Sequence, residues 1–325
     1  MIDKLNRKIE YMRISVTDKC NLRCVYCMPE EGISNIPHEE ILSYEEILII
    51  CRSIAQLGIK TIKITGGEPL VRRDIVRLIG DIKKIEGIEE VTLTTNGVLL
   101  YYMIDDLYEA GIDAINISLD TLDRKKFVQI TRRDEYYNVR KAIEKSIELG
   151  IRVKINCLAI KEYNLNEIVD LAYFSKIHNV DVRFIELMPI GYGNKYSGIS
   201  NEKLLGLLEE CYGSFKKVRE KRGNGPAVYY KNKDFKGCIG FISAISNEFC
   251  ETCNRVRLTS SGFLKLCLHY NKGIDLKEPM RSGISDYDLK DIIYHAIENK
   301  PLGHKFYNID SEKDVEIKNM VQIGG

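Results

Sequence analysis

A short phrase that recurs four times in the first half of the chain constrains its fold most. Each copy places a glycine between a helical pattern and a β-prone run: Leu57-Gly58-Ile59, Glu86-Gly87-Ile88, Ala110-Gly111-Ile112 and Leu149-Gly150-Ile151. Glycine readily takes the left-handed conformation that ends a helix. The phrase therefore predicts an α/β fold in which helices connect the strands of a parallel sheet.

Six short apolar runs are expected to be the strands of this sheet. They cover residues 12–16, 61–65, 91–95, 114–119, 153–160 and 181–187. A capping box of Ser43 and Glu46 opens a helix over residues 44–57, Asp74 is expected to cap a helix that runs to residue 86, and another helix covers residues 165–176. Six such strands predict an incomplete (β/α)6 barrel, in which function gathers at the carboxyl ends of the strands.

The pattern changes after Pro189. A helix is expected over residues 202–211, short strands within 229–245, a hairpin of residues 255–259 and 263–268, and a last helix over 287–298. We therefore expect two parts: residues 1–225 form the partial barrel, and residues 226–325 form a smaller α+β segment.

Composition limits the possible partners. The chain is 44% hydrophobic and 29% charged with a net charge of +1, which is ordinary for a globular protein and argues against nucleic-acid binding or a polybasic membrane anchor. The sequence has no signal-peptide pattern, and its apolar runs are far shorter than a membrane span. A cytoplasmic protein is expected.

Six of the ten cysteines form two sets. Cys20, Cys24 and Cys27 follow the first strand, with three and then two residues between them. Three thiolates leave one position open, so the set predicts either an iron–sulfur cube with one open iron or a zinc knuckle that lacks its fourth ligand. In a cytosolic protein, so many cysteines indicate metal or redox chemistry rather than disulfides.

The second set consists of Cys250 and Cys253, joined by Cys267 through the expected hairpin. On a strand His269 would share a face with Cys267, so spacing alone leaves both a second iron–sulfur cluster and a Cys3His zinc site open. The other cysteines, which are Cys51, Cys157, Cys211 and Cys238, are expected to be small buried hydrophobic residues.

Other candidate residues lie at or near the strand ends. Gly66-Gly67-Glu68-Pro69 follows the second strand, and its glycine pair would let the backbone approach a ligand closely, although an ordinary turn has the same pattern. Six cations could neutralise an anionic substrate: Arg13, Lys63, Lys154, Arg183, Arg255 and Arg257. Each of them alone could instead be a solvated surface charge.

Residues 17–29, Thr-Asp-Lys-Cys-Asn-Leu-Arg-Cys-Val-Tyr-Cys-Met-Pro, resemble the signature of the radical S-adenosylmethionine (SAM) enzymes. Within them the chain is most similar, over nearly its whole length, to the GTP 3′,8-cyclase family that begins molybdenum cofactor synthesis. The resemblance implies a radical SAM barrel, SAM, and two [4Fe-4S] clusters, one on Cys20, Cys24 and Cys27 and one on Cys250, Cys253 and Cys267. It implies conversion of GTP to (8S)-3′,8-cyclo-7,8-dihydroguanosine 5′-triphosphate.

The resemblance also implies roles for single residues. SAM would be bound by Tyr26, Gly67, Ser118 and Met188. GTP would be bound by Arg13, Lys63, Thr94, Lys154, Arg255, Val256 and Arg257. Arg183 and the terminal Gly324-Gly325, which in the family reaches into the active site, would be catalytic. Lys63 stands where arginine is common, and lysine offers phosphate a point charge rather than a fork.

Partners and alternatives follow from the same resemblance. It implies a small electron donor of the flavodoxin or ferredoxin type and a downstream cyclic pyranopterin synthase. Family members are often homodimers, although this sequence carries no oligomerisation signal. The alternatives are a two-cluster peptide-modifying maturase, usually richer in C-terminal cysteines, and a zinc-binding scaffold, which would give the Gly-Gly-Glu turn and the cations no purpose.

Overall fold

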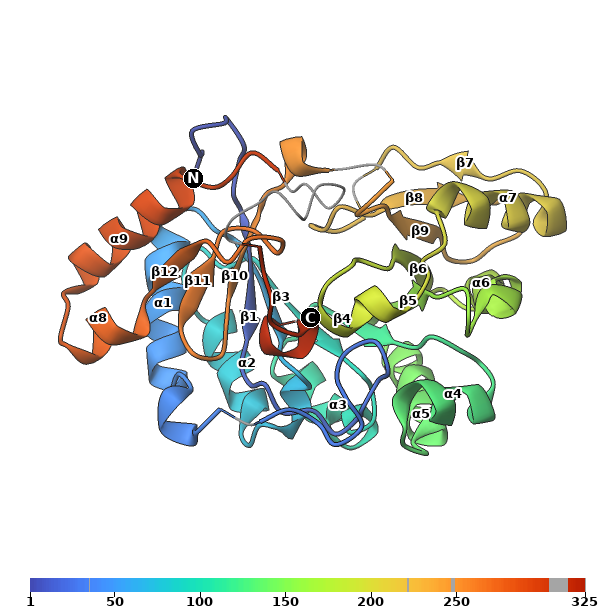
Figure 1. Cartoon of the computed structure of the whole chain (residues 1–325), viewed down its shortest axis with the longest axis horizontal. Helices are drawn as coiled ribbons and strands as arrows, with labels where there is room; N and C mark the ends of the chain where they lie inside the picture. The colour runs from blue at the N-terminus through green and yellow to red at the C-terminus, as the bar shows by residue number, and fades with distance from the viewer. Residues whose placement is uncertain (35, 221, 247–248, 304–314, 325) are drawn as a thin grey trace.

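The computed structural model describes residues 1–34, 36–220, 222–246, 249–303 and 315–324. Their strands form one sheet in the order β12-β11-β10-β1-β2-β3-β4-β5-β6-β9-β8-β7 (Figure 1). The strands are β1 (Tyr11–Ser15), β2 (Thr61–Thr65), β3 (Glu90–Thr95), β4 (Ala114–Ser118), β5 (Arg152–Ala159), β6 (Asp181–Glu186), β7 (Lys216–Lys217), β8 (Val228–Lys231), β9 (Ile239–Ile242), β10 (Arg255–Leu258), β11 (Phe263–Lys265) and β12 (Gly273–Asp275).

Strands β1 to β6 lie side by side in chain order and are all parallel. Their bounds agree with the six predicted strands to within one residue at each end. The helices are α1 (Tyr44–Gln56), α2 (Ile75–Lys83), α3 (Leu100–Glu109), α4 (Arg124–Thr131), α5 (Tyr136–Glu148), α6 (Ile168–Ile177), α7 (Asn201–Tyr212), α8 (Lys277–Arg281) and α9 (Asp286–Glu298). The α/β architecture of parallel strands joined by helices is confirmed.

The helix ends follow the expected local chemistry with one exception. Each glycine of the repeated phrase has a positive φ, between 70° and 90°, as a left-handed helix cap requires. The capping box is present: Ser43 Oγ accepts from the Glu46 N–H, and the Glu46 carboxylate accepts from the Ser43 N–H. Asp74 was the wrong residue for a side-chain cap, because its own backbone is left-handed (φ 59°) and its side chain makes no capping hydrogen bond.

Side chains on the parallel strands alternate between two environments. One face of each strand is apolar and at most 3% exposed, and it packs under the helices in a single core. This face consists of Met12, Ile14, Ile62, Ile64, Val91, Leu93, Ile115, Ile117, Val153, Ile155, Val182 and Phe184. Full burial of such a side chain stabilises the fold by about 1.5–3 kcal/mol. The opposite face, set by the period of two along a strand, is polar and lines the interior.

The C-terminal third extends both edges of the same sheet. Strand β10 pairs parallel with β1, and β9 pairs parallel with β6. The predicted hairpin is confirmed as antiparallel β10 and β11. Helix α9 packs against α1 (Figure 1). Because both parts of the chain share one sheet, the boundary at residue 225 stays a prediction.

The last described residues lie at the centre of the molecule, where Figure 1 shows them in red. They comprise the short 3-10 helix η7 (Met320–Gln322) followed by Ile323 and Gly324, which are both buried. Within the described part of the chain, every helix is too short or too polar to cross a membrane.

Candidate functional site

The first cysteine set lies in the loop that follows β1. All ten cysteines of the chain are free thiols, and Cys20, Cys24 and Cys27 are each partly buried. Burial raises the pKa of Cys20 to about 11, and burial together with the neighbouring thiolates holds the pKa of Cys24 well above its usual range. Three thiols that are costly to ionise in one buried loop suit a metal cluster, whose positive charge would stabilise the thiolates.

The Gly66-Gly67 pair lies against this loop. The Gly67 N–H donates to the Thr17 carbonyl over 2.7 Å, and the Glu68 N–H donates to the Lys19 carbonyl over 2.8 Å. A Cβ on Gly67 would stand 2.4 Å from the Lys19 oxygen, which is closer than atoms can pack. The missing Cβ therefore lets the Gly67 backbone approach the cysteine loop closely.

Glu68 fastens the ends of neighbouring strands. Its buried carboxylate accepts from the Leu70 N–H, from Thr95 Oγ1 and from the Asn96 N–H, at 2.7–3.0 Å. Burial raises its pKa to about 7. The Asn96 amide in turn donates to Asn21 Oδ1 over 2.7 Å and reaches the Cys20 sulfur at 3.7 Å. The loops that follow β1, β2 and β3 are therefore held together.

Two of the residues expected to bind SAM share a small cavity. Tyr26 and Ser118 line it together with Cys24, Asn96 and Asp120. The Tyr26 hydroxyl donates to Asp120 Oδ2 over 2.6 Å, and Asp120 Oδ1 accepts from the Leu158 N–H over 2.8 Å. Burial raises the pKa of Asp120 to about 6.

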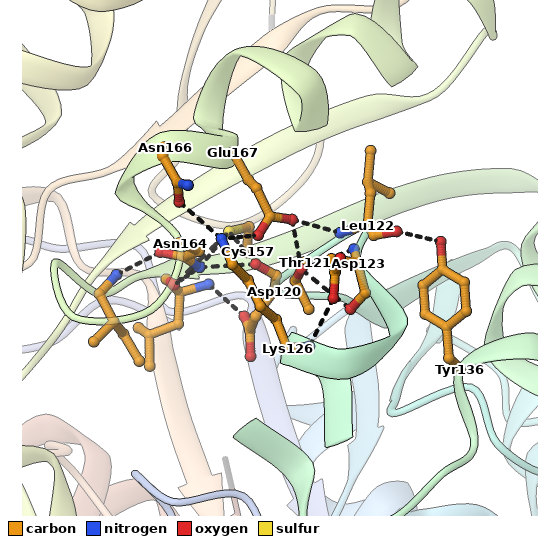
Figure 2. A network of polar contacts seen from close by, with 12 residues as sticks. Asp120, Thr121, Leu122, Asp123, Lys126, Tyr136, Cys157, Asn164, Asn166 and Glu167 are labelled. Atoms are coloured by element: carbon orange, nitrogen blue, oxygen red, sulfur yellow. Dashed lines mark hydrogen bonds and ion pairs between the residues drawn. The ribbon is translucent and has the colours of Figure 1, made fainter. Parts of the chain in front are cut away.

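A polar network behind Asp120 fixes the loop that follows β4 (Figure 2). The buried Asn164 amide donates to the carbonyls of Asp120 and Leu158, over 2.8 and 2.9 Å. Glu167 Oε2 accepts from the Thr121 hydroxyl and the Leu122 N–H, over 2.5 and 3.0 Å. The segment after β5 therefore holds the loop that positions Tyr26.

The second cysteine set surrounds a cavity of about 490 Å³. Cys250 belongs to the 3-10 helix η5 (Cys250–Thr252), Cys253 follows it, and Cys267 follows β11. Met188, expected to bind SAM, lines this cavity rather than the one beside Tyr26. Burial acts to raise the pKa of Cys253, but the positive charges of Lys300 and Arg255 outweigh it, so that this pKa lies below the usual value.

His269 also lines this cavity and packs edge-on against Tyr270, with ring centroids 4.6 Å apart. Within the described ranges, no three His, Cys, Asp or Glu side chains converge on a point as a single metal ion would require. A cubane is held differently, because each cysteine binds a different iron of the cluster. The three thiols line one cavity, and this set of donors suits such a cluster.

A third cavity, of about 740 Å³, occupies the interior face of the parallel strands. The described residues that line it include seven basic side chains and one carboxylate, that of Glu90. The basic residues are Arg13, Lys63, Arg152, Lys154, Arg183, Arg222 and Arg255. Five of the six predicted cations therefore meet in one cavity together with Thr94. Arg255 begins β10, whereas the other four lie within their strands.

The crowding of positive charge in this cavity affects individual side chains. Burial, with the charges of Arg183, Arg13 and Lys154, holds the pKa of Lys63 well below its usual range. Burial, followed by the charge of Arg183, lowers the pKa of Lys154 to about 7. The Arg13 Nε atom is buried and has no hydrogen-bond partner in the structure. A polyanion would relieve all three penalties.

Two amides orient Arg183. Its Nε donates to Asn156 Oδ1 over 2.9 Å, and its Nη2 donates to Asn116 Oδ1 over 2.7 Å. Asn116 Nδ2 lies 3.4 Å from Thr94 Oγ1. Neutral acceptors on β4 and β5 therefore hold the guanidinium of β6 without cancelling its charge.

Residues 222–227 line the same cavity near the amino ends of the strands. The Arg222 guanidinium pairs with both carboxylate oxygens of Asp181, and the backbone carbonyl of Arg222 accepts a hydrogen bond from Lys154 Nζ. Glu90 is occupied by Arg152 and by the Asn224 amide. The cavity thus extends away from the strand ends that carry the cysteine loop.

Arg257, which lines the second cavity, contacts the tail. Arg255 lines both the second and the third cavity. Arg257 Nη1 donates to the Gly324 carbonyl over 3.1 Å. Gly324 has φ 81°, and a Cβ there would stand 2.8 Å from the Ser15 Cβ. Gly324 is thus buried beside Arg257 and β1, whereas Gly325 lies outside the described residues, and entry of the tail into the active site stays a prediction. Val256 points into the apolar core, so only its backbone could meet a ligand.

Several site residues were not foreseen from the sequence, namely Asn116, Asn156, Tyr229, Arg222 and Asp181. Asn156 lies two positions after Lys154 on β5, and Asn116 lies two positions before Ser118 on β4. The period of two along those strands could therefore have found both amides. Nothing in the sequence connects Tyr229 and Arg222 to Lys154, because the contacts span 75 and 68 residues.

Profiles of two families match the chain. The Radical SAM superfamily matches residues 14–174, and Molybdenum Cofactor Synthesis C matches residues 180–306. A GTP 3′,8-cyclase of Clostridium perfringens is 46% identical over 325 residues, with both chains covered completely. A GTP 3′,8-cyclase of Desulforamulus reducens is 46% identical over 329 residues, again with full coverage.

The fold also resembles a solved structure. Streptococcus suis SuiB bound to S-adenosylmethionine superposes with a TM-score of 0.58 at 18% identity, covering 95% of this chain and 68% of that chain. At this identity the likeness shows the fold alone.

Proposed function

The chain belongs to the family of GTP 3′,8-cyclases, which are radical SAM enzymes, and on that premise we propose a site for each partner of the reaction. The substrate is GTP, and the product is (8S)-3′,8-cyclo-7,8-dihydroguanosine 5′-triphosphate, the first intermediate on the way to the molybdenum cofactor. The observation that carries this assignment is the third cavity, whose described lining includes seven basic side chains and one carboxylate.

Two [4Fe-4S] clusters and SAM are the cofactors of the family. Cys20, Cys24 and Cys27 hold the first cluster, and Tyr26, Gly67 and Ser118 contribute to binding SAM beside it. When bound, the reduced cluster and SAM supply the 5′-deoxyadenosyl radical that removes a hydrogen atom from the ribose. Asp120 keeps the Tyr26 ring in place, and the Glu68 network keeps the cysteine loop closed over the strand ends.

The third cavity binds GTP. A nucleoside triphosphate brings about four negative charges, and a chain of net charge +1 must neutralise them locally. Arg13, Lys63 and Lys154 donate to phosphate oxygens, and the unpartnered Arg13 Nε gains an acceptor. Thr94, the backbone of Val256, and Arg255 with Arg257 complete the contacts, and Arg255 connects the substrate cavity with the second cluster site.

Cys250, Cys253 and Cys267 hold the second cluster, beside which the guanine base lies. Arg183, oriented by Asn156 and Asn116, positions the reacting part of the nucleotide together with the terminal Gly324-Gly325, of which Gly324 accepts a hydrogen bond from Arg257. Enclosure by the tail and by residues 222–227 excludes water and other hydrogen donors from the interior.

The finer partners complete the proposal. A small electron donor of the flavodoxin or ferredoxin type serves the enzyme, a cyclic pyranopterin synthase uses its product, and the protein works in the cytoplasm as a homodimer. The family relationship favours this reading over a peptide-modifying maturase, because GTP 3′,8-cyclases are 46% identical over the whole chain.

The test is anaerobic incubation of reconstituted protein with SAM, a reductant and GTP, followed by mass analysis of the nucleotide. Wild-type protein should hold about eight irons per chain, four per cube. Cys24→Ser should lose one cluster and all SAM cleavage, whereas Cys253→Ser should lose the other cluster and the cyclised product but keep SAM cleavage.

Cys211→Ser is the matched control, because Cys211 is exposed on α7 and not buried as the sequence suggested. A colourless, zinc-loaded protein with full activity would overturn the assignment. So would a Cys253→Ser variant that still forms the cyclised nucleotide.

A further inference from the structure

The β10–β11 hairpin holds the C-terminal segment at two points. Arg257 on β10 and Lys265 on β11 are direct cross-strand partners. Arg257 donates to the Gly324 carbonyl, and the Lys265 ammonium pairs with Glu316 Oε2. Two neighbouring cations of one hairpin therefore hold two ends of the same ten-residue segment, 315–324.

The Lys265–Glu316 ion pair joins this segment to the hairpin, and it is deeply buried, with both side chains 1% exposed. Lys265 Nζ also donates to the Tyr270 carbonyl over 2.8 Å, and Glu316 Oε1 accepts from the Lys318 N–H over 2.8 Å. The Glu316 N–H donates to the His269 carbonyl over 2.8 Å. The charges are paired and further hydrogen-bonded, as burial requires.

The rest of the segment adds weaker contacts. Asn319 lies against Gly191, since a Cβ added to Gly191 would stand 2.7 Å from Asn319 Oδ1. Ile323 packs with Ile190 in a small apolar cluster separate from the main core. Between the anchors Ile317 is 87% exposed. Apolar contacts of this size tolerate a slip along the chain, but a slip would leave Lys265 or Glu316 buried without its partner.

We propose that the Lys265–Glu316 ion pair is a positioning device for catalysis: it sets the register of residues 315–324, so that Gly324 reaches Arg257 beside the substrate cavity. The same hairpin continues to Cys267, two residues beyond Lys265. The pair thereby ties the position of the tail to the loop that carries a ligand of the second cluster. The catalytic part of this inference rests on the proposed function; the structural part does not.

The experiment uses full-length, reconstituted protein and compares Glu316→Gln with the double variant Lys265→Met/Glu316→Met. The single change leaves a buried ammonium without its carboxylate. The double change removes both charges, which proteins often tolerate without loss of stability. Asp113→Asn is the matched control, because Asp113 also accepts from a lysine, Lys83, and from a backbone N–H, that of Val91, but lies far from the tail.

Two quantities are measured: hydrogen exchange of the C-terminal peptide that begins at Val315, and the ratio of cyclised nucleotide to 5′-deoxyadenosine. In both tail variants the peptide should exchange about tenfold faster or more, while strands β1 to β6 keep their protection. The ratio should fall at least about tenfold, since a displacement of about 1 Å costs ~100-fold in rate. The control should match wild type in both.

A loss of stability alone would reduce both products together and leave their ratio unchanged. The proposal is overturned if the double variant shows wild-type exchange at the tail, or if its ratio equals that of wild type. If wild-type protein itself forms no cyclised nucleotide, the proposed function fails, and the exchange measurement still decides whether the pair holds the tail.

Discussion

The Lys154 ammonium lies 3.0 Å from the Tyr229 hydroxyl oxygen and 5.0 Å from the centroid of the Tyr229 ring. Burial, and then the charge of Arg183, lowers the pKa of Lys154 to about 7. The residue expected to bind phosphate is therefore close to half-protonated at neutral pH in the free protein. Binding of the anionic substrate should therefore favour the protonated form of Lys154.

Binding of GTP should consequently weaken as the pH rises above about 7. The charged amine binds phosphate, so above its free-state pKa the site must take up a proton on binding, and affinity should fall by up to about tenfold per pH unit. Anaerobic equilibrium dialysis with GTP between about pH 6 and 9 measures this fall. Lys154→Arg, which keeps its charge, should show a much flatter profile, and equal slopes for both proteins would contradict the prediction.

The lowered pKa of Lys154 has the opposite effect on folding stability, which should increase as the pH rises. Below about pH 7 Lys154 is charged in both the folded and the unfolded chain, and the folded protein bears the full penalty of burial. Between about 7 and 10.4 only the unfolded chain keeps the proton, so the contribution of Lys154 to the free energy of unfolding increases with pH. Comparison of urea unfolding of wild type and Lys154→Met across this range isolates the effect.

Asn156→Ala should lower turnover more than substrate affinity. Arg183 Nε would lose its 2.9 Å partner, and the guanidinium would no longer be held between β4 and β5. A displacement of about 1 Å predicts a fall of ~100-fold in product formation, whereas the positive charge that attracts GTP remains. Asn138→Ala, on α5, should behave like wild type. Equal losses in affinity and turnover would show that Asn156 binds substrate and does not orient Arg183.

Local chemistry explains why most of the fold could be predicted. A glycine after each helix and β-prone residues after each glycine act through neighbours in sequence alone. The bounds of the six predicted strands therefore agree with the structure to within one residue. Asp74 shows the limit of such reasoning, because an acidic residue before a helix predicts a cap only when its backbone is extended. Cys211 was expected to be buried, yet α7 turns it to solvent.

The site was predictable where strand alternation decides it, and not where distant segments meet. Successive side chains of a strand point to opposite faces, and neighbouring parallel strands are in the same register of this alternation. One inward face therefore carries Arg13, Lys63, Lys154 and Arg183. Tyr229 on β8 and Glu316 in the C-terminal segment meet their partners only through tertiary packing. The contact between Gly67 and Lys19, 48 residues earlier, is also of this second kind.

Gly67→Ala should therefore damage the first cluster site. The new Cβ would stand 2.4 Å from the Lys19 carbonyl, so the loop must move and lose the bond between the Gly67 N–H and Thr17. Overpacking of this kind costs about 1–3 kcal/mol of unfolding free energy. Iron analysis should show loss of about four irons, with SAM cleavage lost as well.

Gly206→Ala supplies the control, because it lies within α7 with no atom within 4 Å of the new Cβ. It should stabilise the protein by about 0.5–1 kcal/mol and leave the iron content unchanged. A Gly67→Ala protein that keeps both clusters would mean that the cysteine loop is not held as the structure shows.

Gly324→Ala tests the tail directly. Its φ of 81° is strained for alanine, which costs about 1–2 kcal/mol, and its Cβ would lie 2.8 Å from the Ser15 Cβ. The tail should leave its place beside Arg257, and the cyclised product should fall by ~100-fold while iron content, SAM cleavage and GTP binding stay near wild type. Deletion of Gly324 and Gly325 should have the same or a larger effect.

Ser15→Gly in the Gly324→Ala background separates the two causes of this loss. It removes the atom that the new Cβ meets but leaves the strained φ, so activity should recover only in part. Ser15→Gly alone should keep most of the wild-type activity, because the Ser15 side chain donates one hydrogen bond, to the Thr17 carbonyl over 3.2 Å, and the backbone pairing of β1 with β2 remains. Recovery in the double variant would show that the contact between the tail and β1 determines turnover. If the protein without both glycines forms product at the wild-type rate, the tail is buried beside Arg257 but does not position the substrate.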